Sequence, residues 1–164
     1  MMRQLISLLA VIFLAAPALA QNHGEIARVQ AGRSCVACNL FQADLSFRRL
    51  SDIDLSRSRL RQADLQLAIM DRTRFDGANL SVANLFGARF IGASFVNANF
   101  EDASVVGAYF GGANLRGANL TGANLSGSEL GGALGLTQTQ LNRACGDAST
   151  RLPAGLTIPR CATR

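Results

Sequence analysis

Every fifth residue of the chain is apolar from Leu40 to Leu130, without a break over 19 positions. About half of all residues are hydrophobic, so an unbroken series of this length arises by chance roughly once in half a million. Two residues earlier, Ala occupies 13 of the 19 positions, and the residue between is Asn or Asp in ten of them. The chain is therefore built from a five-residue repeat.

A period of five fits neither the 3.6-residue turn of a helix nor the two-residue alternation of a strand. It fits a chain that turns a corner every five residues, with one large and one small side chain inward and three outward. Four such sides make a coil of about 20 residues, and coils stack through backbone hydrogen bonds at about 4.8 Å. Asn, Asp and Gly are expected at the corners, where side-chain-to-backbone hydrogen bonds and positive φ are useful.

Units such as Ala78-Asn79-Leu80 and Ala113-Asn114-Leu115 resemble the pentapeptide-repeat family, whose consensus is A(D/N)LXX. The resemblance runs from Cys38 to about Gly132. It implies an all-β fold, a right-handed quadrilateral β-helix of about 4–5 coils that forms a rod of roughly 23 Å. The large inward residues are then the series Leu40 to Leu130, and the small ones are Ala43, Ala63, Ala68 and the series Ala78 to Ala123.

Departures from alanine at the small inward position cluster early in the repeats, at Arg48, Ile53, Ser58 and Thr73. An arginine cannot be buried without a partner at acceptable cost. We therefore expect the first coil to be distorted, or open at its end, near Arg48.

The segment 1–20 has the pattern of a secretory signal peptide. Arg3 precedes an apolar run from Leu5 to Ala16, and the segment ends in Pro17-Ala18-Leu19-Ala20. The run is short for a membrane span. We predict cleavage after Ala20, a periplasmic or secreted protein, and no integral membrane span after cleavage; the alternative is an uncleaved N-terminal anchor.

These patterns divide the chain into four segments: a signal peptide (1–20), an N-terminal cap or loose arm (21–37), the repeats (38–132) and a C-terminal cap (133–164). In the last segment, Thr137 and Gln140 form a capping box that predicts a short helix. We expect this helix to continue past Leu141 and Ala144 until Gly146 ends it.

Four cysteines allow three pairings, and an exported chain favours disulfides. In a rod, Cys35 and Cys38 lie at one end and Cys145 and Cys161 at the other, so we predict the disulfide Cys145–Cys161 and a possible second one, Cys35–Cys38. A redox pair at Cys35 and Cys38, or half of a zinc site, remains the alternative.

Outward residues recur on one side every 20 positions. Phe47, Leu67, Phe86 and Val106 form an apolar stripe that is the candidate surface for an unknown protein partner or for self-association. A second group, Arg49, Arg72 and Arg89 with Arg48 and Tyr109 nearby, suits an anionic partner, although Asp52 and Asp71 dilute its charge. The net charge of +5 falls to +4 without Arg3, and we read it as a mixed-charge surface without nucleic-acid binding.

The sequence supplies no catalytic constellation, cofactor motif or metal site. His23 lies in a segment expected to be flexible, and Asp44 and Asp64 recur on one side at a position expected to stabilise turns. The leading hypothesis is therefore a non-catalytic, exported binding module or scaffold of the cell envelope. The alternatives are a topoisomerase-inhibiting DNA mimic, as in some relatives of this fold, which the basic charge and export signal disfavour, and a membrane-anchored envelope protein.

Overall fold

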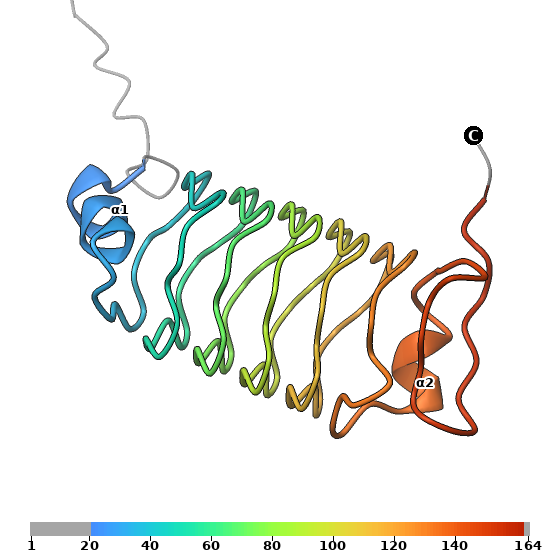
Figure 1. Ribbon diagram of the computed structural model, residues 1–164. Helices are drawn as coiled ribbons and strands as arrows, with labels where there is room; N and C mark the ends of the chain where they lie inside the picture. The colour runs from blue at the N-terminus through green and yellow to red at the C-terminus, as the bar shows by residue number, and fades with distance from the viewer. Residues whose placement is uncertain (1–20, 163–164) are drawn as a thin grey trace, which may run out of the picture.

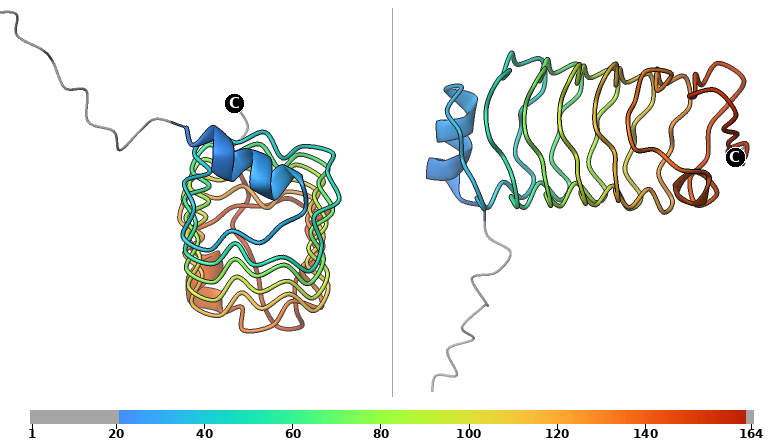
Figure 2. Two further views of the ribbon diagram at one scale, coloured as in Figure 1. Left: turned by 90° about the vertical axis from the view of Figure 1, so that its left-hand side faces the viewer. Right: turned by 90° about the horizontal axis from the view of Figure 1, so that it is seen from below.

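The structure, a computed structural model, describes residues 21–162. From residue 36 onward the chain turns at every fifth position, and the residue midway between two turns forms a parallel β-bridge with the residue 20 positions later. These bridges run from Asn39↔Arg59 to Asn114↔Leu134. The chain is thus wound into a four-sided solenoid of stacked coils (Figures 1 and 2). The bridges are isolated, and the regular elements of the described residues are two helices, α1 (His23–Gln30) and α2 (Gln138–Leu141).

We number the coils and corners by residue. Coil 1 is 41–60, coil 2 is 61–80, coil 3 is 81–100, coil 4 is 101–120 and coil 5 is 121–140. In coil 1, corners A, B, C and D are 41–42, 46–47, 51–52 and 56–57, and sides 1 to 4 follow corners A to D in that order. Adding 20 gives the equivalent residue in the next coil. Side 1 therefore lies between corners A and B.

The predicted inward positions are confirmed. Every member of the Leu40 to Leu130 series is buried, and so is every alanine at the small inward position. Two polar departures, Ser58 and Thr73, are buried as well, and each hydroxyl donates to a carbonyl of the preceding turn of chain: Ser58 Oγ to Cys35 O at 2.8 Å and Thr73 Oγ1 to Leu50 O at 2.9 Å. A buried hydroxyl with such a partner avoids the desolvation penalty.

Of the two alternatives predicted for the first coil near Arg48, distorted or open at its end, the distortion is wrong. The ladder passes through this position with Ile69 N donating to Arg48 O and Leu50 N to Ile69 O, each at 2.8 Å. The Arg48 side chain is exposed instead of buried, because coil 1 is the first coil and leaves room at its end. Its Nη1 lies 3.5 Å from Gln30 O of α1.

The corners bend through left-handed backbone at their second residue, where φ is 53° at Gln42, 59° at Phe47 and 64° at Gly77. Glycine recurs there, as expected. The Asn and Asp residues were expected at the corners, but they lie midway along the sides. From there each stabilises the following corner, as when Asp44 Oδ1 accepts a hydrogen bond from Ser46 N at 3.0 Å.

Helix α1 lies across the N-terminal end of the solenoid (Figure 2, left). Asn22 caps its start by accepting from Glu25 N, and its buried Ile26 and Val29 join the core. Glu25 Oε2 accepts from Asn39 N at 2.6 Å, and Gln30 Nε2 donates to Asp44 O at 2.8 Å. The segment 21–37 was expected to form either a cap or a loose arm, and the structure shows a cap. His23 is the first residue of this helix, so its expected place in a flexible segment is corrected.

The C-terminal cap replaces side 4 of coil 5 with α2. The predicted capping box is confirmed, with Thr137 and Gln140 exchanging both hydrogen bonds. The helix ends at Leu141 and not near Ala144, because the chain rejoins the ladder: Cys145 N donates to Ala123 O and Leu125 N to Cys145 O. The tail then pairs with Gly146 through Arg160.

The predicted signal peptide, residues 1–20, lies outside the described residues. Within residues 21–162, neither helix is long and apolar enough to cross a membrane.

Candidate functional site

The predicted apolar stripe lies along corner B. Phe47 is 67% exposed, Leu67 44% and Phe86 47%, whereas Val106 is half-buried. Backbone hydrogen bonds stack these corners directly: Phe47 N donates to Gln66 O, and Leu67 N to Phe86 O, both at 2.8 Å. The stripe therefore spans four consecutive coils, as its 20-residue spacing predicts.

The exposed fraction of the stripe side chains is largest at Phe47 in coil 1 and smallest at Val106 in coil 4. The Leu67 side chain lies over Gly87, where an added Cβ would meet Leu67 Cδ2 at 2.7 Å. At Gly107, one coil further on, an added Cβ would meet nothing within 4 Å. The apolar surface of corner B is therefore packed between coils at Leu67 and Gly87 and open beside Gly107.

Two members of the predicted arginine group are paired with carboxylates, Arg72 at corner C and Arg89 on side 2. Arg72 forms a two-point ion pair with Asp52, both N–O distances being 2.6 Å, and this contact lowers the pKa of Asp52. Arg89 pairs in the same way with the buried Asp71. Each pair joins neighbouring coils. Arg48 and Arg49 are exposed and form no ion pair within residues 21–162.

Asp44 and Asp64 form a parallel bridge, but their carboxylates serve the turns. Asp44 Oδ1 accepts from the hydroxyl and the N–H of Ser46, and these hydrogen bonds lower the pKa of Asp44. Asp64 Oδ1 accepts from Gln66 N and from Asn84 Nδ2. A general acid would need a raised pKa, so this arrangement does not favour acid–base chemistry.

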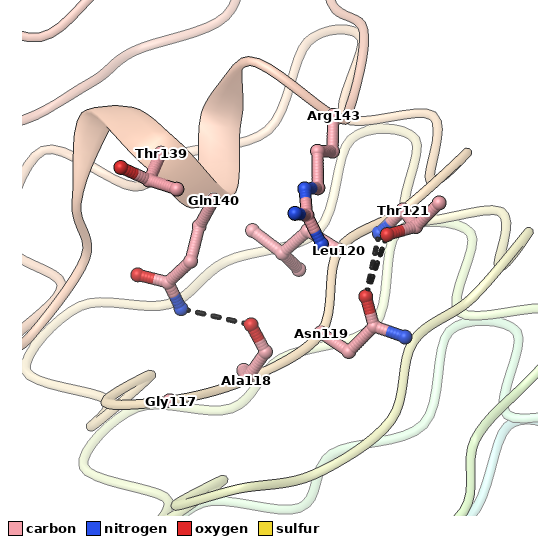
Figure 3. Close-up of a pocket in the computed structure, with 8 residues that line it drawn as sticks. All are labelled: Gly117, Ala118, Asn119, Leu120, Thr121, Thr139, Gln140 and Arg143. Atoms are coloured by element: carbon pink, nitrogen blue, oxygen red, sulfur yellow. Dashed lines mark hydrogen bonds between the residues drawn. The ribbon is translucent and has the colours of Figure 1, made fainter.

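A hollow of about 360 Å³ lies between α2 and coils 4 and 5 (Figure 3). Its floor is structural, because the Gln140 amide donates to Leu115 O at 2.8 Å and to Ala118 O at 2.9 Å. Ala118 O lies at the edge where the regular ladder stops, and Gln140 supplies its missing donor, whereas Leu115 O also accepts from Ala118 N. The sequence indicated Gln140 only as part of a capping box; its contact with coil 4 depends on where the cap folds back.

Both predicted cysteine pairs are disulfides in the structure, Cys35–Cys38 and Cys145–Cys161. The four thiols are therefore occupied, which leaves no zinc-binding thiolate in this state. Among residues 21–162, no three His, Cys, Asp or Glu side chains gather as a metal ion would require.

Comparison with known proteins identifies the family. The model of pentapeptide repeats matches residues 38–77, 70–102 and 98–134, with eight copies. Together these ranges cover more than half of the chain, and the chain belongs to the pentapeptide-repeat family. No curated protein sequence matches it.

Among solved structures, the chain is similar to the pentapeptide repeat protein Rfr23 of the cyanobacterium Cyanothece 51142, with 29% identity and a TM-score of 0.54 over 79% of this chain and 97% of that one. It is also similar to HetL of Nostoc sp. PCC 7120, a protein involved in heterocyst differentiation regulation (28% identity, TM-score 0.48, 78% and 61% covered). A third is a thylakoid-lumen pentapeptide repeat protein of Arabidopsis thaliana (30%, 0.41, 62% and 71%).

Proposed function

We propose that this protein is a non-catalytic, exported binding module of the cell envelope, wound right-handed like its family, which holds a protein partner through the apolar stripe of corner B. The observation that carries the proposal is the exposure of Phe47, Leu67 and Phe86 on consecutive coils. Aromatic and aliphatic side chains gathered on a rigid surface are typical of protein-binding sites.

Export is supported by the pattern of segment 1–20 and by the two disulfides, which persist in oxidising compartments. A non-catalytic role is supported by the carboxylates and cysteines described above, each of which has a structural partner. The ion pairs of Arg72 with Asp52 and of Arg89 with Asp71 reduce the positive charge near side 2, which favours a protein partner over a nucleic acid.

The experiment is affinity capture from cell envelopes with three forms of the mature chain: wild type, Phe86→Ser and Ile91→Ser. Phe86 and Ile91 are the first residues of adjacent corners in coil 3 and are equally exposed, at 47%. The two variants therefore lose similar apolar surface at corner B or at corner C.

We expect Phe86→Ser to lose at least about 90% of the captured partner, since burial of a Phe side chain contributes about 1.5–3 kcal/mol. Ile91→Ser should retain it. Equal capture by all three forms would contradict the role of corner B, and mass spectrometry that found segment 1–20 still attached would contradict export of a cleaved form.

A further inference from the structure

Along corner A, a positive and a negative side chain lie one coil to either side of coil 3. Arg61 is exposed in coil 2 and Glu101 in coil 4, with Val82 between them in coil 3. Two coil spacings, about 10 Å, separate the charges along the rod. Within residues 21–162 neither side chain has an ion-pair partner, in contrast to Arg72 and Arg89.

Val82 is unusual in its own backbone. Its φ is 58°. Within residues 21–162, no other β-branched residue has a positive φ. β-Branched residues strongly disfavour this region, and the equivalent position of the next two corners of the same coil is Gly87 and Gly92. Val82 is also 44% exposed, so the core does not require it. Strain of this kind commonly accompanies a functional surface.

Side 1 and corner B continue the same pattern. On corner B, coils 2, 3 and 4 carry the apolar residues Leu67, Phe86 and Val106. Midway along side 1 the same coils carry the polar residues Asp64, Asn84 and Ser104, which are bridged to one another. If coil 4 of a second copy faced coil 2 of the first, each of these rows would bring together side chains of complementary chemistry.

We propose that side 1, with corners A and B, binds a second copy of this chain in antiparallel orientation about a two-fold axis at coil 3. This inference rests on the proposed binding role and names the partner. On corner A, Arg61 of each copy then meets Glu101 of the other, and Val82 meets Val82.

The same axis matches the other two rows of the face. On corner B, Leu67 meets Val106 and Phe86 meets Phe86. On side 1, Asp64 meets the hydroxyl of Ser104. A single symmetry operation therefore pairs opposite charges, apolar side chains and a hydrogen-bond donor with an acceptor.

Other arrangements of the same face are less favourable. In a parallel dimer corner A would meet corner B, which places Arg61 against Leu67 and Glu101 against Val106. Burying charges against apolar side chains is costly. An antiparallel dimer through side 2 about the same coil would bury the Arg89 side chain of each copy, and desolvation of the Arg89–Asp71 ion pair is costly. Side 1 with its axis at coil 3 avoids both conflicts.

The test is sedimentation equilibrium of the mature, disulfide-bonded protein over a range of concentrations. Each dimer holds two Arg61–Glu101 contacts, so we expect Arg61→Glu and Glu101→Arg each to weaken the dimer at least about tenfold. The double variant Arg61→Glu/Glu101→Arg should restore it to within about threefold of wild type. Arg57→Glu, an exposed arginine of corner D in coil 1, makes the same charge change as Arg61→Glu and should leave the dimer unchanged.

A cysteine pair checks the register. Val82→Cys lies on the axis and should form a disulfide between copies on oxidation, whereas Gln62→Cys, an equivalent left-handed position of corner A, should not. Circular dichroism establishes that each variant is folded. A wild-type monomer at all concentrations, a double variant that stays weakened, or crosslinking at Gln62→Cys in place of Val82→Cys would overturn the proposal.

These outcomes are separate from those of the envelope capture. A monomeric protein that still captures a different protein through corner B retains the proposed function and loses the dimer. A dimer that captures nothing else retains side 1 as a self-association surface and removes the external partner.

Discussion

The rings of Phe75 and Phe95 stack in successive coils, with centroids 4.8 Å apart and planes within 4° of parallel. Phe90 meets both rings edge-on, at 5.9 and 5.2 Å. The coil spacing equals the preferred separation of stacked aromatic rings, so the ladder and the rings stabilise the same geometry. The middle of the rod is therefore held by ring stacking as well as by its backbone hydrogen bonds.

Truncation of this stack should be costly. We expect Phe95→Ala to lower the free energy of unfolding by about 3–5 kcal/mol, because it leaves a cavity between rings that cannot collapse. Phe95→Leu should cost less than about 1.5 kcal/mol, since Leu fills the same inward position in neighbouring coils. Denaturant unfolding measures both. Equal losses would contradict this expectation, because they would show that filling the inward position with Leu does not compensate for the lost ring.

Relief of strain at Val82 should stabilise the folded monomer. We expect Val82→Gly to raise the free energy of unfolding by up to about 1 kcal/mol. Left-handed backbone costs a non-glycine residue about 1–2 kcal/mol, but glycine loses more conformational entropy on folding, which offsets part of the gain. Gly77→Ala, at an equivalent left-handed corner, should lower it by about 1 kcal/mol. Thermal unfolding of dilute protein checks the signs, and a less stable Val82→Gly would contradict this account of the corner.

The Gln140 amide should be important for the C-terminal cap. Gln140→Ala leaves Ala118 O without its donor, while Leu115 O keeps its hydrogen bond from Ala118 N, and we expect the free energy of unfolding to fall by about 1–3 kcal/mol. Thr139→Ala, on the same helix, should stay within about 0.5 kcal/mol of wild type. Hydrogen exchange should show the loss of protection in coil 4 as well as in α2. Loss confined to α2 would mean that Gln140 acts on the helix alone.

Acid should weaken the cap through Asp147. The Ser149 hydroxyl, with the N–H groups of Gly127 and Ser149 and the Thr150 hydroxyl, lowers the pKa of Asp147 from 3.8 to about 2. A lowered pKa in the folded state adds stability above pH 3.8 that is lost as the pH falls towards 2. Asp147→Asn should therefore show a smaller decrease in stability between pH 4 and 2 than wild type. An unchanged pH profile would contradict this assignment.

Much of the fold could be predicted from the sequence, because a strict five-residue period determines which side chains face inward. The ends could not be predicted so well. The helix α1 has a recognisable start in Asn22 and Glu25, yet it is short and has no repeat to support it. At Arg48 the period predicts an inward side chain, but an inward position at the end of the rod is open to solvent, so the side chain is exposed.

The surface was predictable where it depends on the period alone. The 20-residue spacing places Phe47 with Leu67, and Phe86 with Val106, but the pairing of Arg89 with Asp71 links a side to the corner of the preceding coil. Such a contact depends on the three-dimensional arrangement of neighbouring coils. For the same reason the sequence predicts Asn and Asp at the corners, whereas these residues lie midway along the sides and their side chains reach the corners from there.

The most direct test of the binding role is site-specific photo-crosslinking in intact cells, with the probe placed in coil 3 at position 86, 91 or 96, the first residues of corners B, C and D. The account predicts partner crosslinks from position 86 and few from positions 91 and 96. Equal crosslinking from all three corners, or none from position 86, would contradict it.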